Sequence, residues 1–206
     1  MFYFAALTVL AVGALLASEY HRLRLGIWIA KPLAASGFVA AALAAGALHS
    51  TYGRWILAAL VLSWVGDVLL IPRASPQIFR AGILSFLLGH AAFVGAFAVR
   101  GLDPLTCALA ALITAGLTAL ALRWLRPHVP VEMRIPVYAY MAVISAMLVC
   151  AAGTSGAGWI LLGALMFYIS DLAVARDRFV AASFSNRAWG LPLYFGAQLV
   201  LASTVA

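Results

Sequence analysis

Two acidic residues lie inside runs of residues that are apolar enough for a lipid bilayer. Asp67 lies in the run Leu62–Arg73, and Asp171 lies in the run Gly163–Phe179. An acid at membrane depth costs roughly 2.5–3.5 kcal/mol on insertion scales, so each needs a partner or a chemical role. One interpretation is a structural pair in which each acid binds a neighbouring arginine or lysine. A functional role is favoured, because two acids exceed what the single lysine of the chain can neutralise.

A lysine and a histidine lie in neighbouring apolar runs. Lys31 precedes Pro32, and because a residue before a proline tends to leave helical geometry, we expect an interrupted helix that aims the ammonium inward. Lys31 would then act as counter-ion to the aspartates or bind a phosphate; the alternative is an anchor that snorkels to the interface. His90 follows Gly89 in a third run. It has either a role in the site or a hydrogen bond across the bundle.

Four further polar side chains are candidates for lining the same cavity: Tyr138, Tyr168, Tyr194 and Gln198. Interhelical hydrogen bonding or anchoring at the membrane interface is the alternative for each of them. The other histidines fall in connections, and the two cysteines, Cys107 and Cys150, lie far apart inside apolar runs. We therefore expect no metal site and no disulfide.

The composition identifies lipid as the solvent of this chain. Of its 206 residues, 66% are hydrophobic and 9% are charged, against about 25% charged in soluble domains. The net charge of +7 comes from arginines and one lysine spread over the ends of apolar runs. Because no basic stripe carries interleaved aromatic residues, we expect membrane anchoring and no nucleic-acid partner.

Eight runs are long enough to cross a bilayer, which needs about 20 mostly apolar residues. The connections between them are short, so consecutive helices are expected to be antiparallel neighbours in one integral membrane domain, residues 1–206. The sequence therefore predicts an all-α, polytopic bundle of eight transmembrane helices. The expected spans are 2–18, 25–47, 54–71, 81–99, 102–122, 134–152, 157–175 and 188–204.

The arginines predict how this bundle is oriented. Ten of the twelve, Arg73 among them, lie in the first, third, fifth and seventh connections, and the other two lie in even-numbered ones. Because basic residues favour the cytoplasmic side, we expect the odd connections to face the cytoplasm and both termini to face the outside. Lys31, Asp67 and Asp171 then lie roughly 7–10 Å inside the cytoplasmic face, at the mouth of a polar funnel.

An internal repeat is also predicted. The interval of 35 residues from Pro32 to Asp67 recurs from Pro136 to Asp171, an offset of 104 positions. Because each half would contain four helices, the halves would share an orientation and be related by an axis along the membrane normal, which would bring the two aspartates face to face. The two halves would be residues 1–101 and 102–206.

Four short motifs follow one another along the chain. They are Lys31-Pro32-Leu33, Leu62–Leu70 with Gly66-Asp67, Phe86 with Gly89-His90, and Gly163–Asp171. In order and spacing this series resembles the YhhN-like lysoplasmalogenase family of eight-helix membrane proteins, from the second apolar run to the eighth. The chain departs from that family at Phe93, where members often have tyrosine. The resemblance implies hydrolysis of the vinyl ether bond of lysoplasmalogens, with Asp67 and Asp171 as the acid/base pair.

The implied chemistry suits two carboxyl groups. Vinyl ether hydrolysis begins with protonation of the outer vinyl carbon, and water then attacks the oxocarbenium ion. Two close carboxylates in a partly desolvated cavity tend to share one proton, so one can protonate carbon while the other, ionised, stabilises the cation. Lys31 would bind the head-group phosphate or adjust the pair, and His90 would position water or substrate. The lysophospholipid would enter from the membrane, and no metal or cofactor is needed.

A proton-coupled transporter of a small molecule or lipid is the main alternative. Paired membrane acids, a parallel repeat and a helix broken at Lys31 all fit alternating access. Against it, the polar residues gather toward one face of the membrane. A structural or assembly protein is a third interpretation, which predicts that arginines neutralise both acids and that no cavity exists. For a bacterial chain, the expected location is the inner membrane.

Overall fold

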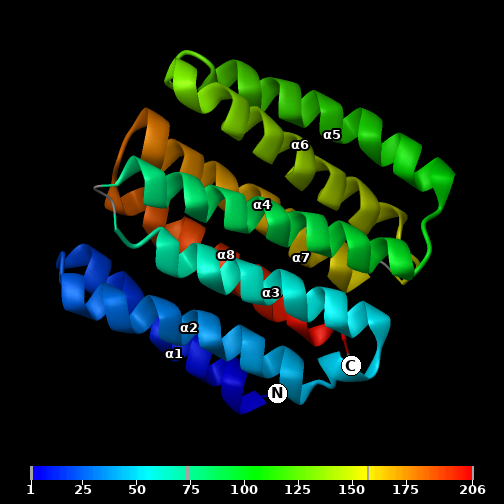
Figure 1. Cartoon of the computed structure of the whole chain (residues 1–206), viewed down its shortest axis with the longest axis horizontal. Helices are drawn as coiled ribbons and strands as arrows, with labels where there is room; N and C mark the ends of the chain where they lie inside the picture. The colour runs from blue at the N-terminus through cyan, green and yellow to red at the C-terminus, as the bar shows by residue number, and fades with distance from the viewer. Residues whose placement is uncertain (1, 73–74, 157, 206) are drawn as a thin grey trace.

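A computed structural model of the chain describes residues 2–72, 75–156 and 158–205, and these residues form a bundle of eight α-helices (Figure 1). Seven of the helices, with η2 continuing the seventh, are long and apolar enough to cross a membrane. The predicted polytopic helical bundle is confirmed. The helices are α1 (Phe2–Tyr20), α2 (Arg24–Ala44), α3 (Thr51–Leu69), α4 (Pro76–Val99), α5 (Pro104–Leu125), α6 (Val131–Gly153), α7 (Gly158–Ala175) and α8 (Phe184–Ser203), with a short 3₁₀ turn η1 (Ala47–His49) and a π-helical turn η2 (Arg176–Val180).

The eighth helix differs from the other seven. It is as long as its neighbours, but it falls below the hydropathy of a membrane span. Its polar residues Asn186 and Gln198 are buried, because α8 packs against α7, α1 and α2 inside the bundle. Polar groups that face other helices carry no cost against lipid. The eighth span therefore stays a prediction that rests on packing and length.

Short polar side chains fix where several helices begin. The hydroxyls of Ser50, Ser75 and Ser183 each accept a hydrogen bond from the backbone N–H three residues on. Asp103 does the same before α5, and hydrogen bonds from Thr106 hold the pKa of this exposed carboxyl below its ordinary value. Such caps satisfy orphan donors of the first turn. Because the Ser75 cap precedes Pro76, α4 begins five residues before the expected start of that span at 81.

The expected interruption at Lys31 is wrong. Helix α2 continues through Pro32, and α6 and α8 likewise continue through Pro136 and Pro192. A proline removes one backbone hydrogen bond from a helix. Packing against neighbouring helices keeps such helices intact in membrane proteins. Lys31 is therefore directed by its place on a continuous helix.

The helices pack in pairs. The closest pairs are α3 with α4 and α7 with α8, while α1 packs on α2 and α5 packs on α6 at the two outer edges (Figure 1). Helix α4 lies against α6, and α2 lies against α8, so each of these contacts has a counterpart when the two halves are exchanged. The contact between α1 and α8 has no counterpart of similar size among the described residues. The predicted repeat agrees with most of the packing and stays a prediction.

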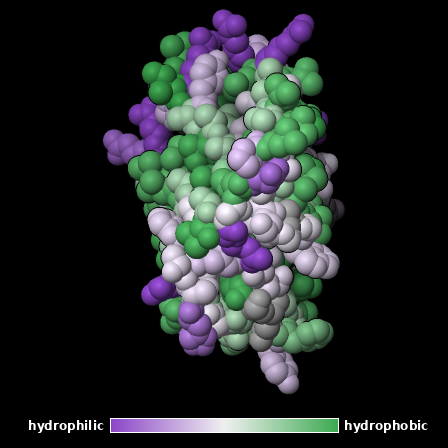
Figure 2. All heavy atoms as spheres, turned by 90° about the vertical axis from the view of Figure 1, so that its right-hand side faces the viewer, coloured by the Kyte–Doolittle hydropathy of each residue, from purple (hydrophilic) through white to green (hydrophobic). Residues whose placement is uncertain are grey.

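The membrane orientation also stays a prediction, and Arg73, one of the ten arginines on which it rests, lies outside the described residues. Both described ends of the chain and the even-numbered connections lie at the right of Figure 1. Figure 2, which looks at that end, shows hydrophilic side chains scattered among apolar ones.

Candidate active site

Asp67 lies on α3 and is held by residues from two other helices. Its side chain is 3% exposed, and its Oδ1 lies 3.2 Å from Nζ of Lys31 on α2. The hydroxyl of Tyr194 on α8 donates a 2.6 Å hydrogen bond to Oδ2, and Gln198 Nε2 donates to that hydroxyl at 3.1 Å. A carboxylate that faces an ammonium and a hydroxyl donor is in a setting that suits its ionised form. These four residues form the Asp67 cluster.

Asp171 on α7 has different partners. The hydroxyl of Tyr140 on α6 donates a 2.7 Å hydrogen bond to Oδ2, and Nε2 of His90 on α4 lies 3.6 Å from the same oxygen. The side chain is 15% exposed, so Asp171 is the more accessible of the two acids. Among the described contacts no lysine or arginine reaches it. Asp171, Tyr140 and His90 form the Asp171 cluster.

The backbone fixes which nitrogen of His90 carries its proton. Nδ1 lies 2.7 Å from the carbonyl oxygen of Phe86, and a carbonyl only accepts, so Nδ1 is the donor. In the neutral ring Nε2 is then an acceptor. Nε2 is buried without a hydrogen bond among the described residues, and Oδ2 of Asp171 lies 3.6 Å from it. This tautomer turns a proton acceptor toward Asp171.

Aromatic rings connect the two clusters. The Phe167 ring lies 4.5 Å from the ring of His90 and 5.2 Å from that of Tyr194, centroid to centroid. Phe86 contacts Tyr194 at 5.8 Å, and a Cβ at Gly66 would lie 2.6 Å from the Phe86 ring. Glycine beside Asp67 therefore admits this ring. The clusters share an aromatic wall, and no described hydrogen bond joins the two carboxylates directly.

Each acid takes a partner from the other half of the chain. Asp67 and Asp171 are separated by 104 positions, and so are His90 and Tyr194. Asp67 binds Tyr194, while Asp171 faces His90. Such crossed pairs are what a twofold arrangement of two repeats would produce. This arrangement supports the predicted duplication without testing it.

Two of the predicted tyrosines lie away from both acids. The hydroxyl of Tyr168 shares a hydrogen bond of 3.1 Å with Thr118, which also bonds Ser145. Tyr138 lies at an open hollow between α5 and α6. The two clusters thus contain six of the eight predicted site residues: Asp67, Asp171, Lys31, His90, Tyr194 and Gln198.

The sequence analysis missed Tyr140. The buried face of α6 contains Val137, Met141 and Ile144. Tyr140 follows Val137 by three positions and precedes Ile144 by four, so it belongs to this face, whereas Tyr138 does not. The apolar periodicity of the helix contains this signal.

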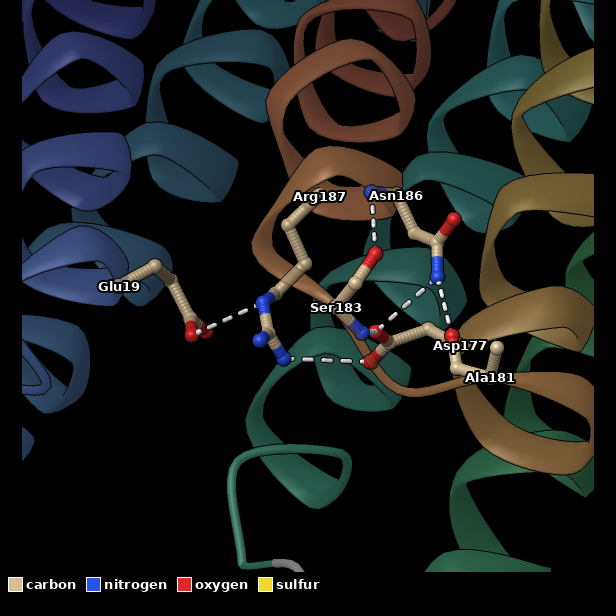
Figure 3. A network of polar contacts seen from close by, with 6 residues as sticks. All are labelled: Glu19, Asp177, Ala181, Ser183, Asn186 and Arg187. Atoms are coloured by element: carbon tan, nitrogen blue, oxygen red, sulfur yellow. Dashed lines mark hydrogen bonds and ion pairs between the residues drawn. The ribbon is translucent and has the colours of Figure 1, made fainter.

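A polar network fixes the chain just after α7 (Figure 3). Asp177 in η2 accepts hydrogen bonds from the backbone N–H of Ser183 at 2.9 Å and from Arg187 Nη1 at 3.2 Å. Nε of Arg187 lies 3.3 Å from Glu19 at the end of α1, and Asn186 also donates to Asp177. The network ties α1, η2 and α8 together one turn and a half beyond Asp171. It holds the end of the helix that carries the accessible acid.

Metal-ligand residues do not gather in the described part of the chain. No group of three His, Cys, Asp or Glu side chains there is placed to hold a metal ion, and Cys107 and Cys150 are free and half-buried. The two described surface hollows lie along α5 and α6, and neither is lined by Asp67 or Asp171. Lys31 is 13% exposed and Asp171 is 15% exposed, so each cluster has one side chain that reaches the surface.

Fold and site together define an integral multi-pass membrane protein with two acid-centred polar clusters inside a helical bundle. Residues 26–205 match the profile of the YhhN family, and the chain belongs to that family. It is 32% identical over 166 residues to a lysoplasmalogenase of Mycobacterium bovis, covering 76% of this chain and 62% of that protein.

Mammalian proteins are similar as well. The human lysoplasmalogenase TMEM86B is 34% identical over 151 residues, which cover 73% of this chain and 62% of the human protein. The rat TMEM86B is 36% identical over 152 residues, which cover 71% of this chain and 60% of the rat protein. The chain therefore spans about 62% of the length of the first relatives it matches. No solved structure matches it.

Proposed function

We propose that this protein is a lysoplasmalogenase-type hydrolase, which cleaves the vinyl ether bond of a lysoplasmalogen within the membrane. The products would be a fatty aldehyde and a glycerophospho-head group. The names of the relatives support the reaction. The observation that carries the mechanism is the unequal setting of Asp67 and Asp171.

Asp67 is the anion in this mechanism. Lys31 lies 3.2 Å from one oxygen and Tyr194 donates to the other, so both oxygens accept from donors. An ionised carboxylate near the reacting carbon stabilises the oxocarbenium ion as it forms. Because Lys31 already pairs with Asp67, its role is to hold this anion. Other groups would then bind the head-group phosphate.

Asp171 is the general acid. It is the accessible carboxyl, and its described neighbours, Tyr140 and neutral His90, bring no fixed positive charge. Asp171 donates its proton to the outer vinyl carbon, and the carbon that bears the ether oxygen becomes the oxocarbenium carbon. Water attacks that carbon and returns a proton to Asp171. The hemiacetal then breaks its bond to the glycerol oxygen, which gives the aldehyde and the alcohol.

His90 positions the acid. With Nδ1 held by the Phe86 carbonyl, Nε2 can accept a hydrogen bond from protonated Asp171. Such a contact keeps the proton on the oxygen next to Tyr140 until the substrate arrives. In the expected orientation both clusters lie near the cytoplasmic face, and the substrate chain enters from that leaflet.

Release of a fatty aldehyde by the purified, reconstituted protein tests this proposal. The substrate is a lysoplasmalogen, and the matched control is the saturated alkyl-ether analogue, which has no vinyl carbon that could accept a proton. We expect aldehyde from the first and none from the second. Absence of aldehyde from both, together with pH-gradient-driven uptake into liposomes, would instead support the proton-coupled transporter. A helix broken at Lys31 was one argument for the transporter, and α2 is continuous there.

A further inference from the structure

A basic hollow lies at one end of the helix pair α5 and α6, apart from both acid clusters. It is open and has a volume of about 840 Å³. Residues from the end of α5, the following connection and the start of α6 form its wall. They are Leu122, Arg123, Arg126, Pro127, Arg134 and Tyr138.

No described side chain contacts the guanidinium groups of the three arginines of this hollow. In the described ranges no ion pair or hydrogen bond is made by the guanidinium groups of Arg123, Arg126 or Arg134, and Nε of Arg134 is buried without an acceptor. Buried donors are usually satisfied. Glu132 lies two residues from Arg134 on α6, and so points to a different side of that helix. It does not line the hollow.

Other arginines beyond α7 have acidic or aromatic neighbours within the protein. Arg187 contacts Glu19 and Asp177, and the Arg178 guanidinium lies 3.9 Å from the centre of the Phe79 ring. The arginines of the hollow differ from these because no described acidic or aromatic side chain contacts their guanidinium groups.

An apolar groove continues from the hollow along α5. It shares Arg123 with the hollow and has a volume of about 540 Å³. Ile113, Leu117 and Leu120 line it, and all three side chains are exposed. A Cβ placed at Gly116 would meet nothing within 4 Å, so the groove is open there. A basic pocket that leads into an apolar groove on a membrane helix matches a phosphate head group with its attached chain.

We propose that this face of α5 and α6 binds an anionic glycerophospholipid, with its phosphate at the three arginines and an acyl chain along the groove. The site is separate from the acid clusters. Tyr138 lines the hollow while Tyr140 bonds Asp171, and two residues on a helix point about 200° apart. Helix α6 therefore stands between a lipid in this site and the reacting acid.

Lipid binding to the delipidated, purified protein tests the proposal. Native mass spectrometry would compare phosphatidylglycerol, phosphatidylcholine and inorganic phosphate as ligands. We expect phosphatidylglycerol to bind at least tenfold more tightly than phosphatidylcholine. Each basic residue near an anionic head group contributes roughly fivefold in affinity, so the triple variant R123Q/R126Q/R134Q should lose about a hundredfold.

The matched control also removes three positive charges, from other residues at the same end of the bundle as the hollow. Arg22, Arg24 and Arg80 are exposed, and the variant R22Q/R24Q/R80Q should bind phosphatidylglycerol within twofold of the parent chain. An equal loss in both triple variants would show that net charge alone attracts the lipid, and it would overturn the proposal. The single variant R134Q, expected to lose about fivefold, serves if the triple variant fails to fold.

The groove is tested by Gly116→Leu, because a Cβ at Gly116 meets no atom within 4 Å and leaves room for a larger side chain to enter the groove. It should weaken phosphatidylglycerol binding several-fold. Displacement of phosphatidylglycerol by an equimolar amount of inorganic phosphate would mean that the arginines bind a free anion, and would overturn the lipid assignment. Full binding to the R123Q/R126Q/R134Q variant would overturn the site itself.

Discussion

The two aspartates lie at equivalent distances along the two halves of the chain, yet they are held in opposite ways. Asp67 is sealed, 3% exposed, and pairs with the only lysine. Asp171 reaches the surface, and its partners are a tyrosine and a histidine. Position 31 carries lysine where the matching position 135 carries isoleucine. Among the described residues, one cation beside Asp67 gives two identical side chains different surroundings.

The largest expected effect comes from Asp171→Asn. The amide keeps the shape of the side chain and the bond from Tyr140, but it has no acidic proton to give. General acid catalysis contributes about 10²–10⁴-fold, so aldehyde release should fall by about a thousandfold while the variant stays folded. Turnover is measured with the lysoplasmalogen, and folding is checked by thermal unfolding. Full turnover in this variant would remove Asp171 from the mechanism.

Asp67→Asn should also lower turnover, and it carries a cost in stability that Asp171→Asn does not. Removing one partner of a buried ion pair leaves an uncompensated charge, which costs about 3–5 kcal/mol. The loss here should be near the lower value, because Lys31 is 13% exposed.

The double variant K31M/D67N separates these two consequences. It removes both charges, so most of the stability should return while aldehyde release stays low. Thermal unfolding and turnover of the two variants, measured together, provide the test. Recovery of turnover in the double variant would show that Asp67 serves only to neutralise Lys31.

These differences between the acids show what the sequence could predict. Apolar runs of span length predict helices because a chain in lipid must satisfy its backbone bonds internally. An acid within such a run is a site candidate, because inserting it into lipid costs free energy unless it has a partner or a chemical role. The sequence therefore located the helices, and it identified Asp67, Asp171, Lys31 and His90 as site candidates.

Which helix faces which is a property of the packed bundle. Nothing local to Lys31 says that its ammonium meets Asp67, or that the described neighbours of Asp171 include no lysine or arginine. The choice of Tyr140 over Tyr138 follows from the buried face of α6, and that face becomes certain only when α4 and α7 are in place. The helix break expected at Pro32 failed for the same reason, since tertiary packing outweighs a local preference.

Two tyrosines offer a smaller and sharper test of the comparison. Tyr140→Phe removes the donor to the reacting acid, whereas Tyr194→Phe removes a donor to Asp67, which Lys31 still holds. A hydrogen bond to a charged group contributes about 1.5–3 kcal/mol. We expect turnover to fall by about 10–30-fold in Tyr140→Phe and by about threefold in Tyr194→Phe. The reverse order would exchange the roles of the two acids.

The smallest effect concerns Asp103, an acid in water rather than in the bundle. Its carboxylate caps α5, and hydrogen bonds from Thr106 lower its pKa. A carboxyl whose pKa is lowered by folding adds stability above its unfolded pKa, about 3.9, and loses that contribution as the pH falls through the lowered value. Asp103→Asn keeps the acceptor without the charge, so its unfolding temperature should lose this part of the pH dependence, while turnover at neutral pH stays unchanged.

Asp103→Ala removes the cap, so it should lower the unfolding temperature at neutral pH by more than Asp103→Asn does. If Asp103→Asn lowered turnover as Asp171→Asn does, charge loss anywhere in the chain would explain both results, and the contrast between the buried acids would no longer identify a catalytic group.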